Sequence, residues 1–170
     1  MTWLRAAVAA AFVVVALVLQ VSLFPHLAWQ GIVPNLCLLV VVGTALTRGP
    51  QFAMTLGFVA GALLDLAPPA DHVAGRWALA LLLVGYVAGR VRQDVRPTAV
   101  AVVLTVAATS FLGTSVFALS GLVLGDLEAS VPGLLQVIGV GVVWDVLLTP
   151  FVLPLVMRTF ARLEPAAATA

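Results

Sequence analysis

Residues 57–66 read GFVAGALLDL, an apolar run that holds two glycines four residues apart and ends near an aspartate, Asp65. Counting back from this acid, Asp65, Gly61, Gly57 and Ala53 recur every four residues, so they share one face if the segment is helical. Small residues at this spacing let two helices approach closely in lipid. The stretch predicts a transmembrane helix that has a small-residue face and carries a carboxylate at one end.

The composition places the whole chain in the membrane class. It has 170 residues, of which 63% are hydrophobic and 9% are charged, and its mean hydropathy is +1.20. Soluble domains are typically about 45–50% apolar and ~25% charged. We expect a single membrane domain over residues 1–163, followed by a flexible alanine-rich tail over 164–170. The net charge of +1 gives no information about partners, and no nucleic-acid partner is expected.

The apolar segments predict an all-α integral membrane protein with six transmembrane helices in one bundle. A helix needs ~20 apolar residues to cross ~30 Å of hydrocarbon. The expected helices cover residues 6–24, 32–47, 52–66, 73–89, 98–120 and 133–157.

Three of these helices, 32–47, 52–66 and 73–89, are short, so we expect them to stand upright or to lie inside the bundle. An alternative is that the first two of them form one re-entrant hairpin. The apolar run at 6–24 is longer than the core of a secretion signal, and no small-x-small cleavage pattern follows it, so it is interpreted as a retained span.

Arginine placement predicts the orientation. All eight basic residues are arginine, and with six spans seven of them fall on one side: Arg5, Arg48, Arg90, Arg92, Arg96, Arg158 and Arg162. Arg76 falls on the other side, together with the acids Asp71, Asp126 and Glu128. Cytoplasmic loops carry the excess of basic residues, so both termini are expected in the cytoplasm. The arginines of RVRQDVR (90–96) are expected to meet anionic lipid headgroups, and a contact for a partner protein is the alternative.

A second small-residue face lies on the fourth expected helix, where Gly85 and Gly89 are four apart and Ala78 falls on nearly the same side. This face and the one carrying Gly57 and Gly61 could pack against each other, or the latter could receive the helix of a partner. The sequence leaves both alternatives open.

Several polar residues fall at the outer ends of the expected helices. Gln20, Asn35, Asp65 and Arg76 are predicted to form one polar cluster, with Arg76 as the counterion of Asp65, because a carboxylate in lipid needs a partner or a wet recess. The pair could simply hold the bundle together, or it could bind a ligand or partner.

Asp145 lies near the middle of the sixth expected helix and should face the bundle. Hydroxyl groups on the fifth helix are its candidate partners, namely those of Thr105, Thr109, Ser110 and Thr114. Pro150 and Pro154 follow and predict a kink in the same helix.

The sequence carries no motif for catalysis or for a cofactor. It lacks a phosphate-binding loop, HExxH and GxSxG, and it shows no clustered metal ligands. The single Cys37 excludes an internal disulfide, and His26 and His72 are interpreted as solvated loop residues. We therefore expect no enzyme activity, no cofactor and no metal.

Three blocks of the sequence resemble the MreD family of bacterial rod shape-determining membrane proteins. They are PNLCLLVVVGTALTRGPQFAMTLGFVAGALLDL (34–66), VGYVAGRVR (84–92) and WDVLLTPFVLPLVMR (144–158), in the family's order and spacing. The family pattern often has asparagine where this chain has Asp145, so the resemblance does not imply a role that depends on charge at that position.

The resemblance implies a non-enzymatic scaffold of the cell-elongation machinery in the bacterial inner membrane. It implies MreC as a direct partner, bound through its transmembrane helix, beside RodA, a class B penicillin-binding protein and MreB. The family also resembles the substrate-binding subunits of energy-coupling-factor vitamin transporters in fold. A vitamin-transporter subunit is therefore the alternative function, and Ala6 with Ala10, or Ala7 with Ala11, have the small-residue spacing that its coupling helices would need.

Overall fold

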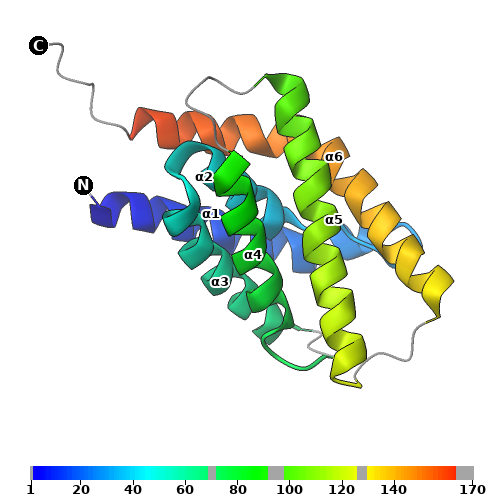
Figure 1. The fold of residues 1–170 in the computed structure, drawn as a ribbon. Helices are drawn as coiled ribbons and strands as arrows, with labels where there is room; N and C mark the ends of the chain where they lie inside the picture. The colour runs from blue at the N-terminus through cyan, green and yellow to red at the C-terminus, as the bar shows by residue number, and fades with distance from the viewer. Residues whose placement is uncertain (1, 69–71, 92–97, 126–129, 164–170) are drawn as a thin grey trace, which may run out of the picture.

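The computed structural model describes residues 2–68, 72–91, 98–125 and 130–163, and in these ranges it is an all-α membrane protein (Figure 1). Asp71, Arg92, Arg96, Asp126, Glu128 and the tail 164–170 lie outside the described residues. The elements are α1 (Thr2–Ser22), a short 3-10 helix η1 (Phe24–Leu27), α2 (Leu36–Arg48), α3 (Pro50–Leu66), α4 (Arg76–Val91), α5 (Ala99–Val123) and α6 (Val131–Arg162).

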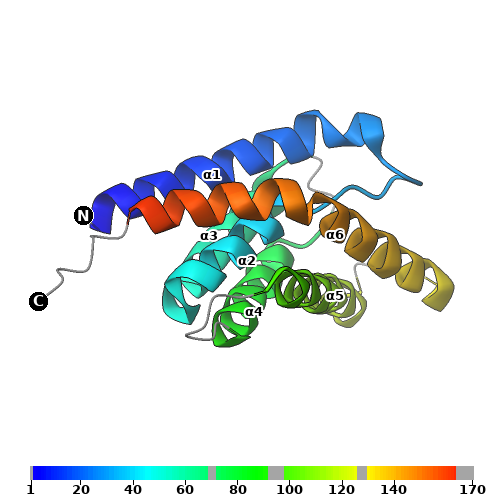
Figure 2. The same cartoon turned by 90° about the horizontal axis from the view of Figure 1, so that it is seen from above.

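Helix α2 is the centre of the fold. It contacts each of the other five α-helices, and all of its residues except the last two are buried. Seen from above, α2 lies between α1 and the C-terminal half of α6 on one side and α4 and α5 on the other (Figure 2). Its mostly apolar sequence therefore meets protein on every side, which explains why it shows no polar face.

Helix α2 begins at Leu36, four residues later than the expected start at residue 32. The side chain of Asn35 accepts a hydrogen bond of 2.9 Å from the backbone N–H of Leu38, so Asn35 is the N-cap and the helix cannot start earlier. Before the cap, Trp29 and Ile32 pair in an isolated antiparallel bridge. The 13 residues of α2 span about 20 Å, which is shorter than the hydrocarbon core of a bilayer.

Among the described residues, three helices have the length and composition to cross a membrane: Trp3–Ser22 in α1, Ala99–Val123 in α5 and Val131–Arg162 in α6. Helices α2 and α3 are shorter apolar helices, and α4 has 16 residues. Helix α6 runs past its expected end at residue 157 to Arg162, contains Pro150 and Pro154, and changes direction between its two halves (Figure 1).

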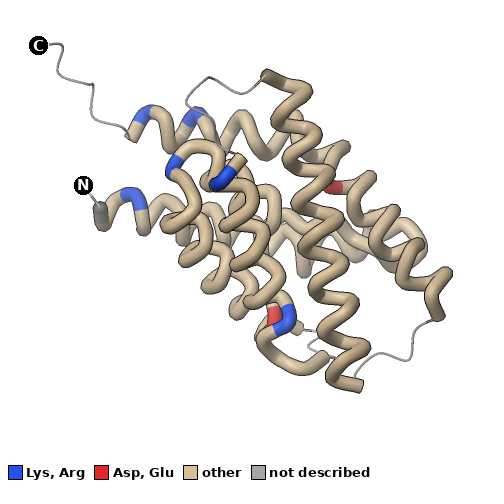
Figure 3. Tube along the Cα trace, viewed as in Figure 1, with Lys and Arg blue, Asp and Glu red and all other residues tan. Residues whose placement is uncertain are grey.

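The described arginines other than Arg76 gather at the end of the molecule where α1 begins and α6 ends (Figure 3). Two of them join other helices to the end of α6. Arg5 of α1 donates a hydrogen bond to the carbonyl of Leu163 at 3.2 Å, and Arg48 of α2 donates one to the carbonyl of Phe160 at 3.1 Å. We refer to this as the arginine end of the bundle. Arg76 lies at the opposite end, beside Asp65 in the chain trace (Figure 3).

Candidate functional site

The small-residue face of α3 is in direct contact with α4. A Cβ atom built on Gly57 would overlap the backbone carbonyl of Leu81, and one built on Gly61 would overlap that of Trp77. The contact is reciprocal, because a Cβ on Gly85 would overlap the carbonyl of Ala53 and one on Gly89 would overlap the backbone of Pro50. Ala53 and Ala78 are buried in the same contact.

The two helices thus approach backbone to backbone, which is the close packing that small residues permit in lipid. The sequence left two alternatives open for this face, namely packing against α4 or binding the helix of a partner. The structure shows the first. The face offers no free groove to the helix of a partner.

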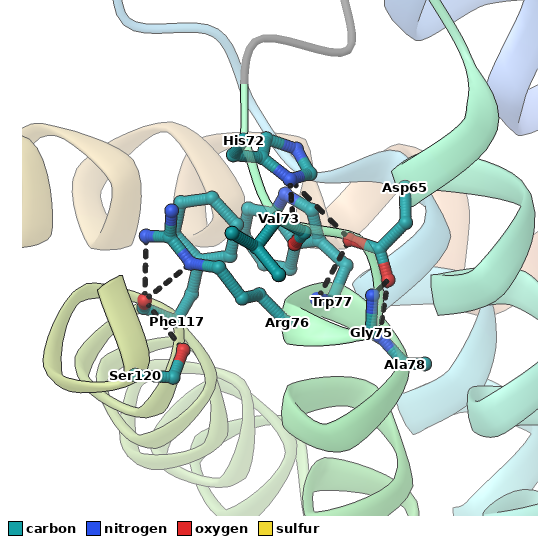
Figure 4. Close-up of polar contacts among 9 residues, drawn as sticks. All are labelled: Asp65, His72, Val73, Gly75, Arg76, Trp77, Ala78, Phe117 and Ser120. Carbon is teal, nitrogen blue, oxygen red and sulfur yellow. Dashed lines mark hydrogen bonds and ion pairs between the residues drawn. The ribbon is translucent and has the colours of Figure 1, made fainter. Parts of the chain in front are cut away.

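Asp65, at the end of this contact, binds the N-terminus of α4. Its carboxylate accepts hydrogen bonds from the backbone N–H groups of Gly75 at 2.9 Å, Trp77 at 3.0 Å and Ala78 at 3.1 Å (Figure 4). The first N–H groups of a helix have no partner within it, and the helix dipole favours an anion there. Asp65, which is only 3% exposed, therefore provides an acceptor for three backbone donors, and its contact with the N–H of Ala78 is buried.

The expected ion pair between Arg76 and Asp65 is not what the structure shows. The guanidinium group of Arg76 turns away from the carboxylate toward α5, where its Nε and one Nη donate to the carbonyl of Phe117 at 3.3 and 2.8 Å (Figure 4). The side chain that approaches Asp65 is His72, whose Nδ1 lies 3.7 Å from a carboxylate oxygen. Backbone donors satisfy the carboxylate, which is why the arginine is available for another contact.

Arg76 and Phe117 connect α4 to α5. The guanidinium carbon lies 4.0 Å from the centre of the Phe117 ring, and the ring of Trp77 stacks on Phe117 at 4.3 Å. Gly121, one turn further along α5, leaves room for the guanidinium group, because a Cβ there would overlap it. The sequence reasoning missed Phe117. An aromatic residue in an apolar run carries no signal that its carbonyl and ring will face an arginine.

Asp145 plays a matching part at the N-terminus of α2. Its carboxylate accepts one hydrogen bond from the backbone N–H of Asn35 at 2.8 Å and one from the hydroxyl of Ser110 at 2.6 Å. Of the four hydroxyl residues considered as partners, Ser110 makes this contact. The others donate to backbone carbonyls of their own helix: Thr105 to Ala101, Thr109 to Thr105 and Val106, and Thr114 to Ser110.

The single polar cluster expected from the sequence is in fact divided between two helix starts. Gln20 and Asn35 belong to the start of α2, where the side chain of Gln20 accepts a 3.4 Å bond from the N–H of Cys37. Asp65 and Arg76 belong to the start of α4. Gln20, Asn35 and Asp65 accept from backbone N–H groups, whose positions depend on where each helix begins, whereas Arg76 donates to a carbonyl of α5.

The buried polar residues at the starts of α2 and α4 hold neighbouring helices together. Within the described ranges, no three residues among His, Cys, Asp and Glu come together to hold a metal ion. The two described acids each accept from backbone donors: Asp145 joins α6 to α2, which are distant in the sequence, and Asp65 joins the consecutive helices α3 and α4.

A family model described as the rod shape-determining protein MreD matches residues 2–159. No curated protein and no solved structure matches the chain.

Proposed function

The chain belongs to the MreD family of rod shape-determining proteins, and from this premise we propose that it is a non-enzymatic scaffold of the cell-elongation complex that binds the transmembrane helix of MreC. The family match supports a membrane protein that determines rod shape. MreC would bind elsewhere on the bundle, because the small-residue face of α3 is occupied by α4.

A groove between α1 and α3 is the best candidate for the MreC helix, and we call it the α1–α3 groove. It has a volume of about 310 Å³. The residues that line it are Ala6, Ala9, Ala10, Val13 and Val14 of α1, with Phe52, Thr55, Leu56, Val59 and Leu63 of α3. Ala9, Val13 and Leu56 are buried and form its floor, whereas Ala6 and Ala10 are exposed at its rim.

The lining chemistry suits a transmembrane helix. Helices in lipid associate through close packing, because hiding apolar surface from apolar lipid gains nothing, and small residues on one helix let another approach its backbone. In the α1–α3 groove, Ala6, Ala9 and Ala10 of α1 provide such a surface over a little more than one helical turn. This small-residue lining is the observation that carries the proposal.

The test compares two matched pairs of substitutions on α1. Ala6→Leu with Ala10→Leu fills the rim of the groove, whereas Ala7→Leu with Ala11→Leu adds the same bulk to exposed positions that do not line it. We expect the first pair to reduce recovery of MreC in a mild-detergent pull-down about tenfold, which corresponds to ~1.4 kcal/mol. The second pair should leave recovery unchanged. Equal recovery with both pairs would refute docking in this groove.

The wider assembly is part of the same proposal. We infer that residues 1–163 act as one domain in the bacterial inner membrane, with the arginine end in the cytoplasm, as the excess of arginine there favours. RodA, a class B penicillin-binding protein and MreB would then belong to the same complex, through MreC or by direct contact. The orientation is tested with the single substitutions Trp3→Cys and Leu163→Cys. In intact cells, both cysteines should be protected from a thiol reagent that does not cross the membrane.

A subunit of a vitamin transporter is the second candidate. It is favoured by two buried donors, Asn35 Nδ2 and Trp144 Nε1, which have no hydrogen-bond partner among the described residues. It is disfavoured because Gln20 and Asp145, polar groups that an outer pocket would use, bind backbone amides. Mass analysis of small molecules in the same pull-down separates the two candidates, since a vitamin present in equal amount with the protein would favour the transporter.

A further inference from the structure

Helices α5 and α6 separate toward the arginine end and leave an apolar cleft of about 680 Å³ between them. Nearer their middles, the two helices are held together by the hydrogen bond between Ser110 and Asp145. The lining of this α5–α6 cleft comprises Ala99, Val102 and Val103 of α5, with Val146, Leu147, Thr149, Pro150, Leu153, Pro154, Met157 and Arg158 of α6.

The cleft continues into a polar hollow along α6. This hollow has a volume of about 460 Å³ and shares Pro150, Pro154 and Arg158 with the cleft. It extends to Thr159 and Arg162. Because Arg158 and Arg162 are four residues apart, both guanidinium groups emerge on one face of the helix, at the end of the apolar surface.

These two arginines differ from the other arginines that the structure describes. Arg5, Arg48, Arg76 and Arg90 each donate to a protein acceptor, respectively the carbonyls of Leu163, Phe160 and Phe117 and the hydroxyl of Tyr86. For Arg158 and Arg162, which are exposed, no hydrogen bond or ion pair is found with any described residue. Two unpartnered positive charges thus lie where an apolar cleft opens.

We propose that the α5–α6 cleft and its two arginines form a binding site for one anionic phospholipid. An acyl chain lies between α5 and α6, and the phosphate accepts hydrogen bonds from Arg158 and Arg162. An arginine donates two parallel bonds to a phosphate, so the pair fits this group in number and geometry. Selectivity follows from net charge, because a zwitterionic lipid brings its own ammonium group to the two guanidinium groups.

The test measures lipid retention by native mass spectrometry. The protein is purified into detergent with equal amounts of phosphatidylglycerol and phosphatidylethanolamine, and the ratio of the two retained lipids is recorded. We expect the wild-type protein to retain phosphatidylglycerol at least fivefold over phosphatidylethanolamine. Arg158→Gln with Arg162→Gln should bring the ratio to about one. Arg90→Gln removes one charge from an arginine that already has a protein acceptor, Tyr86, and should leave the ratio unchanged.

A further variant tests the apolar half of the site. Val103→Trp fills the cleft and leaves both arginines in place, so it should lower retention of phosphatidylglycerol at least threefold while the melting temperature stays within a few degrees of wild type. Undiminished retention in this variant would overturn the proposal.

Two more results would overturn it. One is an equal loss of phosphatidylglycerol in the Arg90 variant, which would indicate general attraction of anionic lipid to the arginine end. The other is displacement of the lipid by glycerophosphoglycerol, the headgroup without acyl chains, which would indicate a site for free phosphate groups.

Discussion

The carboxylate of Asp145, halfway along α6, accepts a 2.8 Å hydrogen bond from the backbone N–H of Asn35, the residue that caps α2. Helix α2 therefore begins at the level of the middle of α6, inside the bundle. Asp65 likewise accepts hydrogen bonds from the backbone N–H groups of Trp77 and Ala78 in the first turn of α4. A helix that starts away from water leaves N–H groups without acceptors, and each unsatisfied group in hydrocarbon costs several kcal/mol. The two buried acids of the described chain meet this need.

Replacing Asp145 separates the need for an acceptor from the need for a charge. In Asp145→Asn, the amide oxygen still accepts from the N–H of Asn35, and the amide NH₂ can donate to Ser110, because a hydroxyl group both donates and accepts. We expect a loss of less than about 1 kcal/mol in the free energy of unfolding. Asp145→Leu leaves both partners unpaired and should cost about 2–5 kcal/mol.

Unfolding in mixed detergent and sodium dodecyl sulfate micelles gives the order of these two variants. Ser110→Ala removes one of the two bonds and should lie between them. If Asp145→Asn were as damaging as Asp145→Leu, the negative charge itself would be required.

Replacing Asp65 by asparagine should be more damaging than the same change at Asp145. All three donors at Asp65 are backbone N–H groups, which cannot accept, so an amide NH₂ placed among them faces donors. We expect Asp65→Asn to lower the free energy of unfolding by about 1–3 kcal/mol. The control is His72→Gln, which should change it by less than ~0.5 kcal/mol because the contact of His72 with Asp65 is long and partly exposed.

Periodicity in the sequence predicted the face that packs α3 against α4. Ala53, Gly57, Gly61 and Asp65 fall on one side of any helix at this spacing, and the chain has the matching glycines at 85 and 89. The distribution of arginines predicted which helix ends lie together. These features follow from patterns along the chain, because residues four apart share a helix face and basic residues collect on one side of a membrane.

The partners of the buried acids could not be derived in this way. A backbone N–H has no residue identity, so the sequence offered Arg76 as the partner of Asp65 when the actual donors belong to Gly75, Trp77 and Ala78. Hydropathy predicts a start of α2 four residues too early, because the apolar run continues before Asn35, whereas the side chain of Asn35 caps the helix. With the correct start, a need for acceptors near Asn35 could have been anticipated.

Gly85→Ala tests the contact between α3 and α4 with the smallest change that affects it. The added methyl group would overlap the carbonyl of Ala53, and because both backbones belong to helices, the helices must separate. We expect a loss of about 3 kcal/mol or more in the free energy of unfolding, measured in mixed micelles. Gly139→Ala is the control, because a Cβ there meets nothing within 4 Å and should be neutral or stabilising by up to about 1 kcal/mol. Equal stability of the two variants would show that α3 and α4 are less closely packed.

Arg76→Lys tests whether this arginine acts on Phe117 or on Asp65. A lysine keeps the charge but cannot place two N–H groups on the carbonyl of Phe117 while lying flat over its ring. We expect Arg76→Lys to cost about 1–2 kcal/mol, close to the cost of Arg76→Gln, because charge is not what the contact requires. If Arg76 were the counterion of Asp65, lysine would largely preserve stability, and Arg76→Gln combined with Asp65→Asn would show strong coupling. The structure predicts a coupling energy below about 1 kcal/mol in that double-mutant cycle, since each residue has its own set of partners.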